Sequence, residues 1–174
     1  MSTGKLTLYT PTLDDLWFRQ RMLEDEETMS YNRAWGGTIP WPRERWASWY
    51  EHWIVHPEGK RFYRYLKDED TGNFVGEIAY HLDEQGMCQA DVIVFAPCRG
   101  QGYGRESLRL LCEAAREHGV DVLYDDMAAD NPAIGLFLSE GFQLVEERPL
   151  TRLLKKDLTR YAAHSSKRDQ IGVQ

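Results

Sequence analysis

The chain opens with a short alternation of apolar and polar residues and then changes to a helical period. Leu6–Tyr9 has the pattern of a brief strand, which Pro11 ends. Apolar positions up to Leu23 then follow helical spacing, and Thr12 or Asp14 stands where a helix cap is expected. The pattern predicts one strand followed directly by one helix.

The next segment is rich in aromatic residues. Two glycines and two prolines predict a loop over residues 31–42. From Pro42 onward, one aromatic face at i, i+3, i+4 and i+7 predicts an amphipathic helix. That face consists of Trp46, Trp49, Tyr50 and Trp53.

The rest of the chain alternates strand and helix patterns. Short polar turns separate three apolar runs, which predicts antiparallel hairpins, and later runs predict three more strands and two helices. The predicted strands are 61–66, 74–81, 87–95, 120–124, 142–145 and 151–155, and the predicted helices are 104–118 and a short one capped by Asp130 or Asn131. This order predicts an α/β (α+β) fold, in which a mixed, mostly antiparallel sheet of about seven strands is flanked by about four helices. One domain over 1–157 is expected, followed by a polar tail over 158–174.

Composition narrows the class of protein. The 174 residues are 42% hydrophobic and 28% charged, which suits a single globular domain with a sizeable core. The net charge of -7 argues against nucleic acid as a partner and mildly favours cationic ones. No window approaches 18 apolar residues, and three cysteines form no C-x-x-C, so we expect a cytoplasmic protein with no membrane partner.

The segment 90–104 carries the clearest chemistry. An apolar strand meets a proline, then Arg99 and three alternate glycines, and then a helix begins. Glycines let a backbone approach a ligand closely, and a helix N-terminus binds phosphate. The spacing excludes G-x-G-x-x-G, because Arg105 follows Gly104, and no Gly-Lys-Ser/Thr is present. A glycine-rich structural turn is the alternative.

Two motifs resemble those of the Gcn5-related N-acetyltransferases (GNAT). Residues 99–104, RGQGYG, match Q/R-x-x-G-x-G/A, and residues 130–142 resemble the second motif, an Asn before a short helix that ends in Gly-Phe. The two motifs occur in the family's order, and the resemblance is strong from about residue 74 to residue 156.

The resemblance implies a binding site for acetyl-CoA. In the family, the strand before the loop bulges and splays from its neighbour, and its backbone pairs with the pantetheine arm, while loop N–H groups hold the pyrophosphate. An N–H near Val94 would polarise the thioester carbonyl. The implied cofactor-binding residues are Ile93, Val94, Phe95, Arg99, Gly100, Gln101, Gly102, Tyr103, Gly104, Arg105, Asn131 and Phe137. Asp130 is the alternative to Asn131, because the second motif is one residue short.

The resemblance also implies direct attack by an amine, which needs a base because free primary amines are mostly protonated at pH 7. Asp91 is the first candidate and Glu77 the second; either could instead be an ordinary strand carboxylate. The family's frequent general-acid tyrosine falls on Phe137, which has no hydroxyl. The leaving thiolate, with a thiol pKa near 8.5, would tolerate the absence of an acid.

The acceptor side is less defined. The aromatic segment could stack on a substrate or enclose a cation, or its helical part could pack on the sheet. Tyr31, Trp35 and Asp126 are the candidate substrate-binding residues, and Asp125 and Asp126 could face the amine or form a solvated loop. No metal site is expected, because His52 and His56 lack a third ligand.

These features predict an N-acetyltransferase that acts on a primary amine of a small molecule or a peptide. A catalytically silent acyl-CoA-binding module, which Phe137 allows, and a protein N-terminal acetyltransferase are the alternatives. An exposed sheet edge or aromatic patch would make a homodimer unsurprising.

Overall fold

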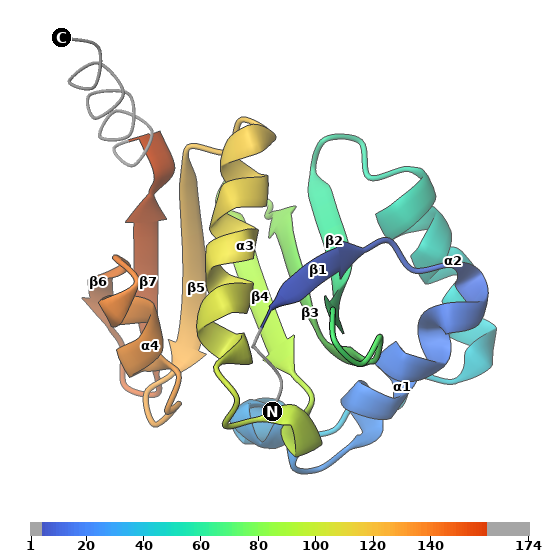
Figure 1. The fold of residues 1–174 in the computed structure, drawn as a ribbon. Helices are drawn as coiled ribbons and strands as arrows, with labels where there is room; N and C mark the ends of the chain where they lie inside the picture. Colours follow the sequence, from blue (N-terminus) through green and yellow to red (C-terminus); the bar gives the residue numbers. More distant parts are fainter. Residues whose placement is uncertain (1–4, 160–174) are drawn as a thin grey trace, which may run out of the picture.

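A computed structural model describes residues 5–159 and contains one seven-stranded sheet in the order β1-β2-β3-β4-β5-β7-β6 (Figure 1). Every neighbouring pair is antiparallel except β4 and β5, which run parallel. The strands are β1 (Leu6–Tyr9), β2 (Arg61–Asp68), β3 (Phe74–Leu82), β4 (Cys88–Val94), β5 (Val122–Ala128), β6 (Gln143–Glu147) and β7 (Thr151–Asp157). The mixed, mostly antiparallel sheet expected from the sequence is confirmed.

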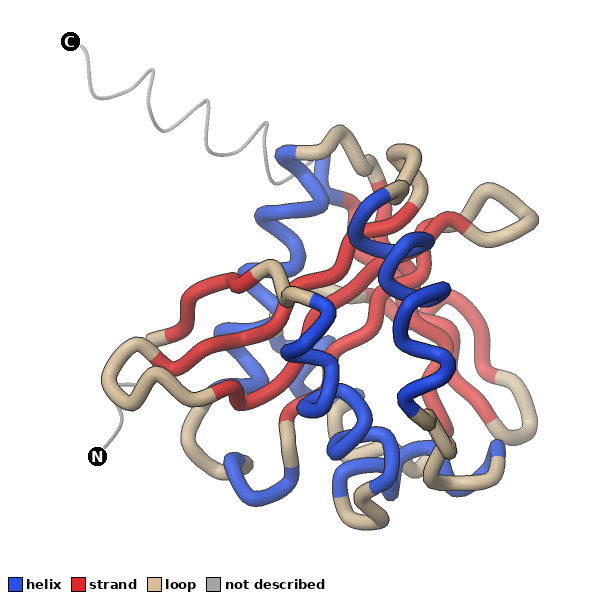
Figure 2. The backbone as a smooth tube through the Cα atoms, turned by 90° about the vertical axis from the view of Figure 1, so that its right-hand side faces the viewer, coloured by secondary structure: helices blue, strands red, loops and turns tan. Residues whose placement is uncertain are grey.

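Helices pack on both faces of this sheet (Figures 1 and 2). The α-helices are α1 (Trp17–Glu24), α2 (Trp46–Tyr50), α3 (Tyr103–Glu117) and α4 (Ile134–Ser139). The chain also forms the 3₁₀ segments η1 (Leu13–Leu16), η2 (Thr28–Trp35), η3 (Arg43–Arg45) and η5 (Ala96–Cys98), and the π segment η4 (Glu51–Val55). The predicted aromatic helix is therefore made of η3, α2 and η4, which have three different hydrogen-bond patterns.

The predicted loop over 31–42 is wrong at its start, because η2 continues to Trp35. Asp25 accepts hydrogen bonds from the N–H and the hydroxyl of Thr28, and Gly36, with φ of 108°, ends the turn. A 3₁₀ segment has three residues per turn, so the 3.6-residue period of an α-helix does not reveal it.

The side chains of the sheet pack in two apolar cores, one on each face. The first packs α3 and α4 against one face and includes Leu108, Leu111 and Ile78. The second packs α1, η2 and α2 against the other face and includes Phe18, Tyr65 and Ile93. Ile93 therefore points away from α3, and the alternation of a strand places Asp91 and Phe95 on the same side.

The sheet splits between β4 and β5. These strands share only two residue pairs, Cys88 with Leu123 and Gln89 with Tyr124. Beyond them β4 stays paired with β3, and β5 stays paired with β7. The splay that the family resemblance implied is thus present, whereas the expected bulge is not seen as a register shift between β3 and β4. At Gly76 a Cβ atom would collide with the carbonyl oxygen of Ile93, so glycine permits the close approach of β3 and β4 at the split.

The predicted polar tail begins with a residue of the apolar core. Leu158, the first residue of the predicted tail, is 1% exposed and belongs to the core around α3. The remainder of the predicted tail, from residue 160, lies outside the described residues. Within residues 5–159, no helix is both long and apolar enough to cross a membrane.

Candidate active site

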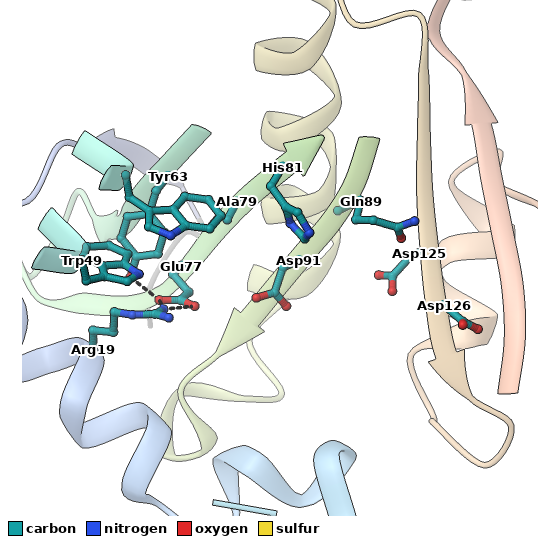
Figure 3. A pocket seen from close by; sticks show the side chains of 12 residues that line it. Arg19, Trp49, Tyr63, Glu77, Ala79, His81, Gln89, Asp91, Asp125 and Asp126 are labelled. Atoms are coloured by element: carbon teal, nitrogen blue, oxygen red, sulfur yellow. Dashed lines mark hydrogen bonds and ion pairs between the residues drawn. The ribbon is translucent and has the colours of Figure 1, made fainter. Parts of the chain in front are cut away.

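A pocket of about 370 Å³ lies at the split between β4 and β5, on the face that carries α1, α2 and η4 (Figure 3). Carboxylates and aromatic rings dominate its walls. The lining residues are Arg19, Trp49, Trp53, Tyr63, Glu77, Ala79, His81, Gln89, Ala90, Asp91, Asp125 and Asp126. The structure thus brings together both predicted catalytic residues, Asp91 and Glu77, and one predicted substrate residue, Asp126.

Asp91 occupies the centre of the pocket. Figure 3 shows it between Glu77 on β3 and Asp125 on β5. Burial raises its pKa to about 7, the negative charge of Glu77 adds to the rise, and Arg19 and the backbone of Val92 oppose it. A carboxylate that exchanges a proton near pH 7 has the property that a general base requires.

Asp125 and Asp126 approach from the other side of the split. Burial raises the pKa of Asp125 well above its usual range, and the charges of Asp91 and Asp126 raise it further. Asp126 forms an ion pair of 3.0 Å with Arg148, in the turn between β6 and β7. The adjacent carboxylates of β5 therefore differ. Asp126 is compensated by a cation, whereas the charges that act on Asp125 within the described residues are those of Asp91 and Asp126, which are negative.

Glu77 is held in a buried ion pair. Its two carboxylate oxygens each lie 2.8 Å from Nη1 of Arg19, and the hydroxyl of Tyr63 donates to it. Glu77 is 1% exposed, and the side chain of Arg19 is 17% exposed. Burial acts to lower the pKa of the Arg19 guanidinium, but the charge of Glu77 raises it above its usual value, so Arg19 stays protonated. These contacts hold the carboxylate of Glu77 in place, whereas among residues 5–159 no such cation is bound to the carboxylate of Asp91.

Three aromatic side chains of the pocket region surround the guanidinium of Arg19. Its guanidinium carbon lies 5.1 Å from the ring centroid of Trp41, 4.7 Å from Trp49 and 5.3 Å from Tyr63. Trp49 also stacks on Trp53, with centroids 6.0 Å apart and planes 18° apart. Trp49 and Trp53 therefore pack α2 and η4 on the sheet and also form a wall of the pocket.

Replacing Glu77 with Gln should mainly destabilise the fold. Loss of the carboxylate leaves the Arg19 charge largely buried without a partner, which costs about 3 kcal/mol in comparable pairs. Chemical denaturation would measure the change in the free energy of unfolding. The control is Glu69→Gln, which removes the exposed pair with Lys5 and should cost less than about 1 kcal/mol. An unfolding free energy like that of wild type, together with lost turnover that high pH restores, would instead make Glu77 the base.

The glycine loop, residues 99–104, lies at the lower end of the split, where β4 ends and α3 begins (Figure 1). Gly100 and Gly102 have φ of 80° and 84°, a conformation that favours glycine, and no atom lies within 4 Å of a Cβ built on either. Gly102 is also the N-cap of α3. The first N–H groups of a helix have no partner within the helix, so this backbone is open to an anionic ligand.

The side chains of this loop are mostly engaged within the protein. Arg99 donates to the backbone carbonyls of Val94, Glu27 and Thr28, which ties the loop to η2. Tyr103 is 3% exposed, and its hydroxyl contacts Asp68 in the interior. Ligand binding by these two residues would involve their backbone groups.

Arg105 faces a second hollow, of about 440 Å³, along α3. Its guanidinium pairs with Glu140, which also accepts a hydrogen bond of 2.9 Å from Arg109. Gln101 and Gly102 line the same hollow. Glu106 and Glu113 line this hollow as well, so the two arginines near the N-terminus of α3 stand among acidic side chains.

The second motif shapes the start of α4. The side chain of Asn131 accepts a hydrogen bond of 2.9 Å from the N–H of Ala133, which fixes the turn before the helix. Phe137 is 3% exposed and packs against Phe142, with ring centroids 4.9 Å apart. Its ring is a core side chain.

We expect Phe137→Leu to leave the shape of the pH–rate profile unchanged on its alkaline side. The residue has no proton to give, so the substitution should only loosen the contact with Phe142, at a cost of about 1 kcal/mol. Steady-state rates between pH 6 and 10 and a thermal melt would measure both effects. Loss of the alkaline limb would show that this position controls proton delivery.

The two aromatic residues predicted to bind substrate differ in position. Tyr31, on η2, is half-buried, and burial with the charges of Asp91, Glu77 and Asp125 raises the pKa of its hydroxyl. It therefore lies close to the carboxylates, although it does not line the pocket. Trp35 is 54% exposed and also lies outside the pocket lining.

Arg19 was not among the site residues predicted from the sequence. Leu16, Arg19, Met22 and Leu23 lie at i, i+3, i+6 and i+7, so the arginine stands on the buried face of α1. A charged residue in that position signals a buried partner, and Glu77 is that partner. As for metal ions, no group of three or more His, Cys, Asp or Glu side chains within the described part of the chain is placed to hold one.

A split parallel strand pair, with a glycine loop and a helix N-terminus at its open end, is the arrangement that the motifs implied for an N-acyltransferase fold. A family model described as acetyltransferase (GNAT) domain matches residues 5–140. The chain therefore belongs to the GNAT acetyltransferase family.

Solved structures agree with this assignment. Spermidine N-acetyltransferase from Vibrio cholerae, in complex with CoA and spermine, is 20% identical over 92% of this chain and 99% of that chain, with a TM-score of 0.72. The Salmonella typhimurium protein yncA with its cofactor acetyl-CoA is 17% identical over 88% and 94%, with a TM-score of 0.69. Ribosomal-protein-alanine N-acetyltransferase from Brucella melitensis is 25% identical over 87% and 99%, with a TM-score of 0.68. No match was found among curated proteins.

Proposed function

We propose that this protein is an acetyl-CoA-dependent N-acetyltransferase that moves an acetyl group to the primary amine of a small molecule or a peptide by direct attack. Membership of the GNAT family supports the reaction class. The observation that carries the proposal is the position of Asp91, a carboxylate with a pKa of about 7 in a pocket at the split between β4 and β5.

The residues around the split fit acetyl-CoA. Past Gln89, no strand formed by residues 5–159 pairs with the edge of β4 that faces β5, so the backbone of β4 can pair with an extended ligand arm. Gly100 and Gly102 leave open space above a helix N-terminus, which suits a pyrophosphate, and Arg105 stands beside them. Neighbours of the same fold that bind CoA or acetyl-CoA support this choice of ligand.

When bound, acetyl-CoA supplies a thioester whose carbonyl carbon an amine can attack. Asp91 holds the incoming ammonium and takes one proton from it, which leaves a neutral amine. An N–H of β4 near Val94 would stabilise the negative charge that develops on the carbonyl oxygen. The thiolate would depart without a protein acid at Phe137, because a thiol with a pKa near 8.5 is a tolerable leaving group. The second proton that the attacking nitrogen loses as the amide forms would pass to this thiolate.

The test is amine-dependent release of CoA from acetyl-CoA, followed with a thiol reagent against a panel of acceptors. The panel includes alkyl amines, amino acids and short peptides that begin with alanine, because one structural neighbour is a ribosomal-protein-alanine N-acetyltransferase. Turnover with an amine supports the proposal. Acetyl-CoA binding without turnover by any acceptor would favour a silent binding module.

A further inference from the structure

The carboxylates of the pocket outnumber the cations that compensate them. Figure 3 shows Glu77, Asp91, Asp125 and Asp126 in a row across the pocket, and Arg19 is the single arginine or lysine in the lining. Arg19 is bound to Glu77, and Arg148 reaches Asp126 from outside the pocket. Asp91 and Asp125 remain, and within residues 5–159 neither has a cation bound to it.

Of these two carboxyl groups, Asp125 is the one that a cationic ligand would stabilise more. Within the described residues it receives no hydrogen bond, and the charges nearest to it, those of Asp91 and Asp126, are negative. Its side chain points from β5 toward β4, into the space that an acceptor would occupy (Figure 3). A desolvated carboxylate in this setting ionises only when a ligand supplies positive charge.

The proposed reaction uses the two carboxylates differently. The reacting amine arrives as an ammonium and gives one proton to Asp91, so that this pair ends as a neutral amine beside a neutral acid. Asp125 takes no part in that exchange, and its carboxyl group stays protonated if the acceptor carries only the reacting amine. A second ammonium on the same acceptor would favour the ionised form of Asp125 and pair with it.

The walls suit the carbon chain that would join two amines. Trp49 and Trp53 present stacked rings on the side opposite β5, and Ala79 and Ala90 add small apolar surfaces. Such surfaces favour methylene groups, while the carboxylates hold the charged ends.

We propose that the acceptor is a diamine, whose reacting amine lies at Asp91 while its second, cationic amine is bound by Asp125. This inference rests on the proposed function and narrows its substrate class. Asp125 then acts as a specificity-determining residue, and Asp126 contributes little because Arg148 already neutralises it.

The test compares α,ω-diaminoalkanes with alkylamines and with amino alcohols of the same length, using CoA release to obtain kcat/KM. We expect wild type to prefer the diamine over the amino alcohol by about tenfold or more, as one partly desolvated ion pair provides. In Asp125→Asn this ratio should fall to near one, because the second amine of the diamine loses its ion pair. Glu117→Gln, at an exposed position near the end of α3, alters net charge equally and should keep the ratio.

Each outcome separates the inference from the function on which it rests. A wild-type ratio near one, which needs no variant, would overturn the inference while CoA release with alkylamines upholds the function. A preference that persists in a folded Asp125→Asn would also overturn it. CoA release with none of the acceptors, despite acetyl-CoA binding, would refute the proposed function itself.

Discussion

Asp91→Asn should lower kcat at pH 7 by about 100-fold or more, the usual contribution of a general base. Asparagine keeps the size of the side chain and cannot accept the proton of the ammonium. In wild type, activity should fall as the pH drops below about 7, because the pKa of Asp91 is about 7 and only its ionised form acts as the base. In the variant, turnover should rise with pH toward the pKa of the amine, where the acceptor is already neutral.

Steady-state rates from pH 6 to 10 would measure both profiles, with acetyl-CoA affinity as a check that the fold is intact. Asp121→Asn is the matched control, since Asp121 is exposed at the start of the strand that carries Asp125. Wild-type turnover by Asp91→Asn at pH 7 would show that the amine loses its proton directly to solvent or to another group.

Gly102→Val should abolish stabilisation by acetyl-CoA. The valine side chain would occupy the open space at the N-terminus of α3, where a pyrophosphate must approach. At a concentration 100 times its Kd, a ligand stabilises the native state by about 2.7 kcal/mol, which a thermal melt resolves readily. We expect this rise in Tm for wild type and almost none for the variant.

The control for Gly102→Val is Gly119→Val, just beyond the other end of α3. Gly119 has φ of 80°, and a Cβ there also meets open space, so both variants carry the same backbone strain of about 1–2 kcal/mol. Both should melt below wild type, but Gly119→Val should keep the full rise with acetyl-CoA. An equal rise in Tm with acetyl-CoA in the two variants would show that the phosphate is not bound at the loop.

Hydrophobic periodicity was sufficient to predict most elements of this fold. β1 was predicted at its observed bounds, and the hairpins were predicted because short polar turns separate runs of period two. Periodicity failed at η2, whose 3₁₀ hydrogen bonds have no 3.6-residue repeat. It predicted a helix at η4 but not the π hydrogen bonds found there. It also could not predict the extent of the split between β4 and β5, because pairing between distant strands leaves no local pattern.

The roles of the active-site residues were also only partly predictable, because contacts between distant segments leave no local sequence pattern. Asp91 and Glu77 were both plausible bases on adjacent strands, and the ion pair with Arg19, 58 residues away in sequence, distinguishes them. Likewise, Asp125 and Asp126 are neighbours in sequence, yet only Asp126 meets Arg148 from the turn after β6. Local sequence identifies groups capable of chemistry, whereas long-range contacts decide which of them remain available.

An acetyl group should pass directly from acetyl-CoA to an amine. A single turnover with deuterium-labelled acetyl-CoA and an accepted amine, analysed by mass spectrometry of the amine and of the intact protein, tests this transfer. We expect labelled acetyl on the amine nitrogen, one CoA released for each, and an unchanged protein mass throughout. Label on the protein before it reaches the amine, or label that stays on CoA with every amine offered, would contradict it.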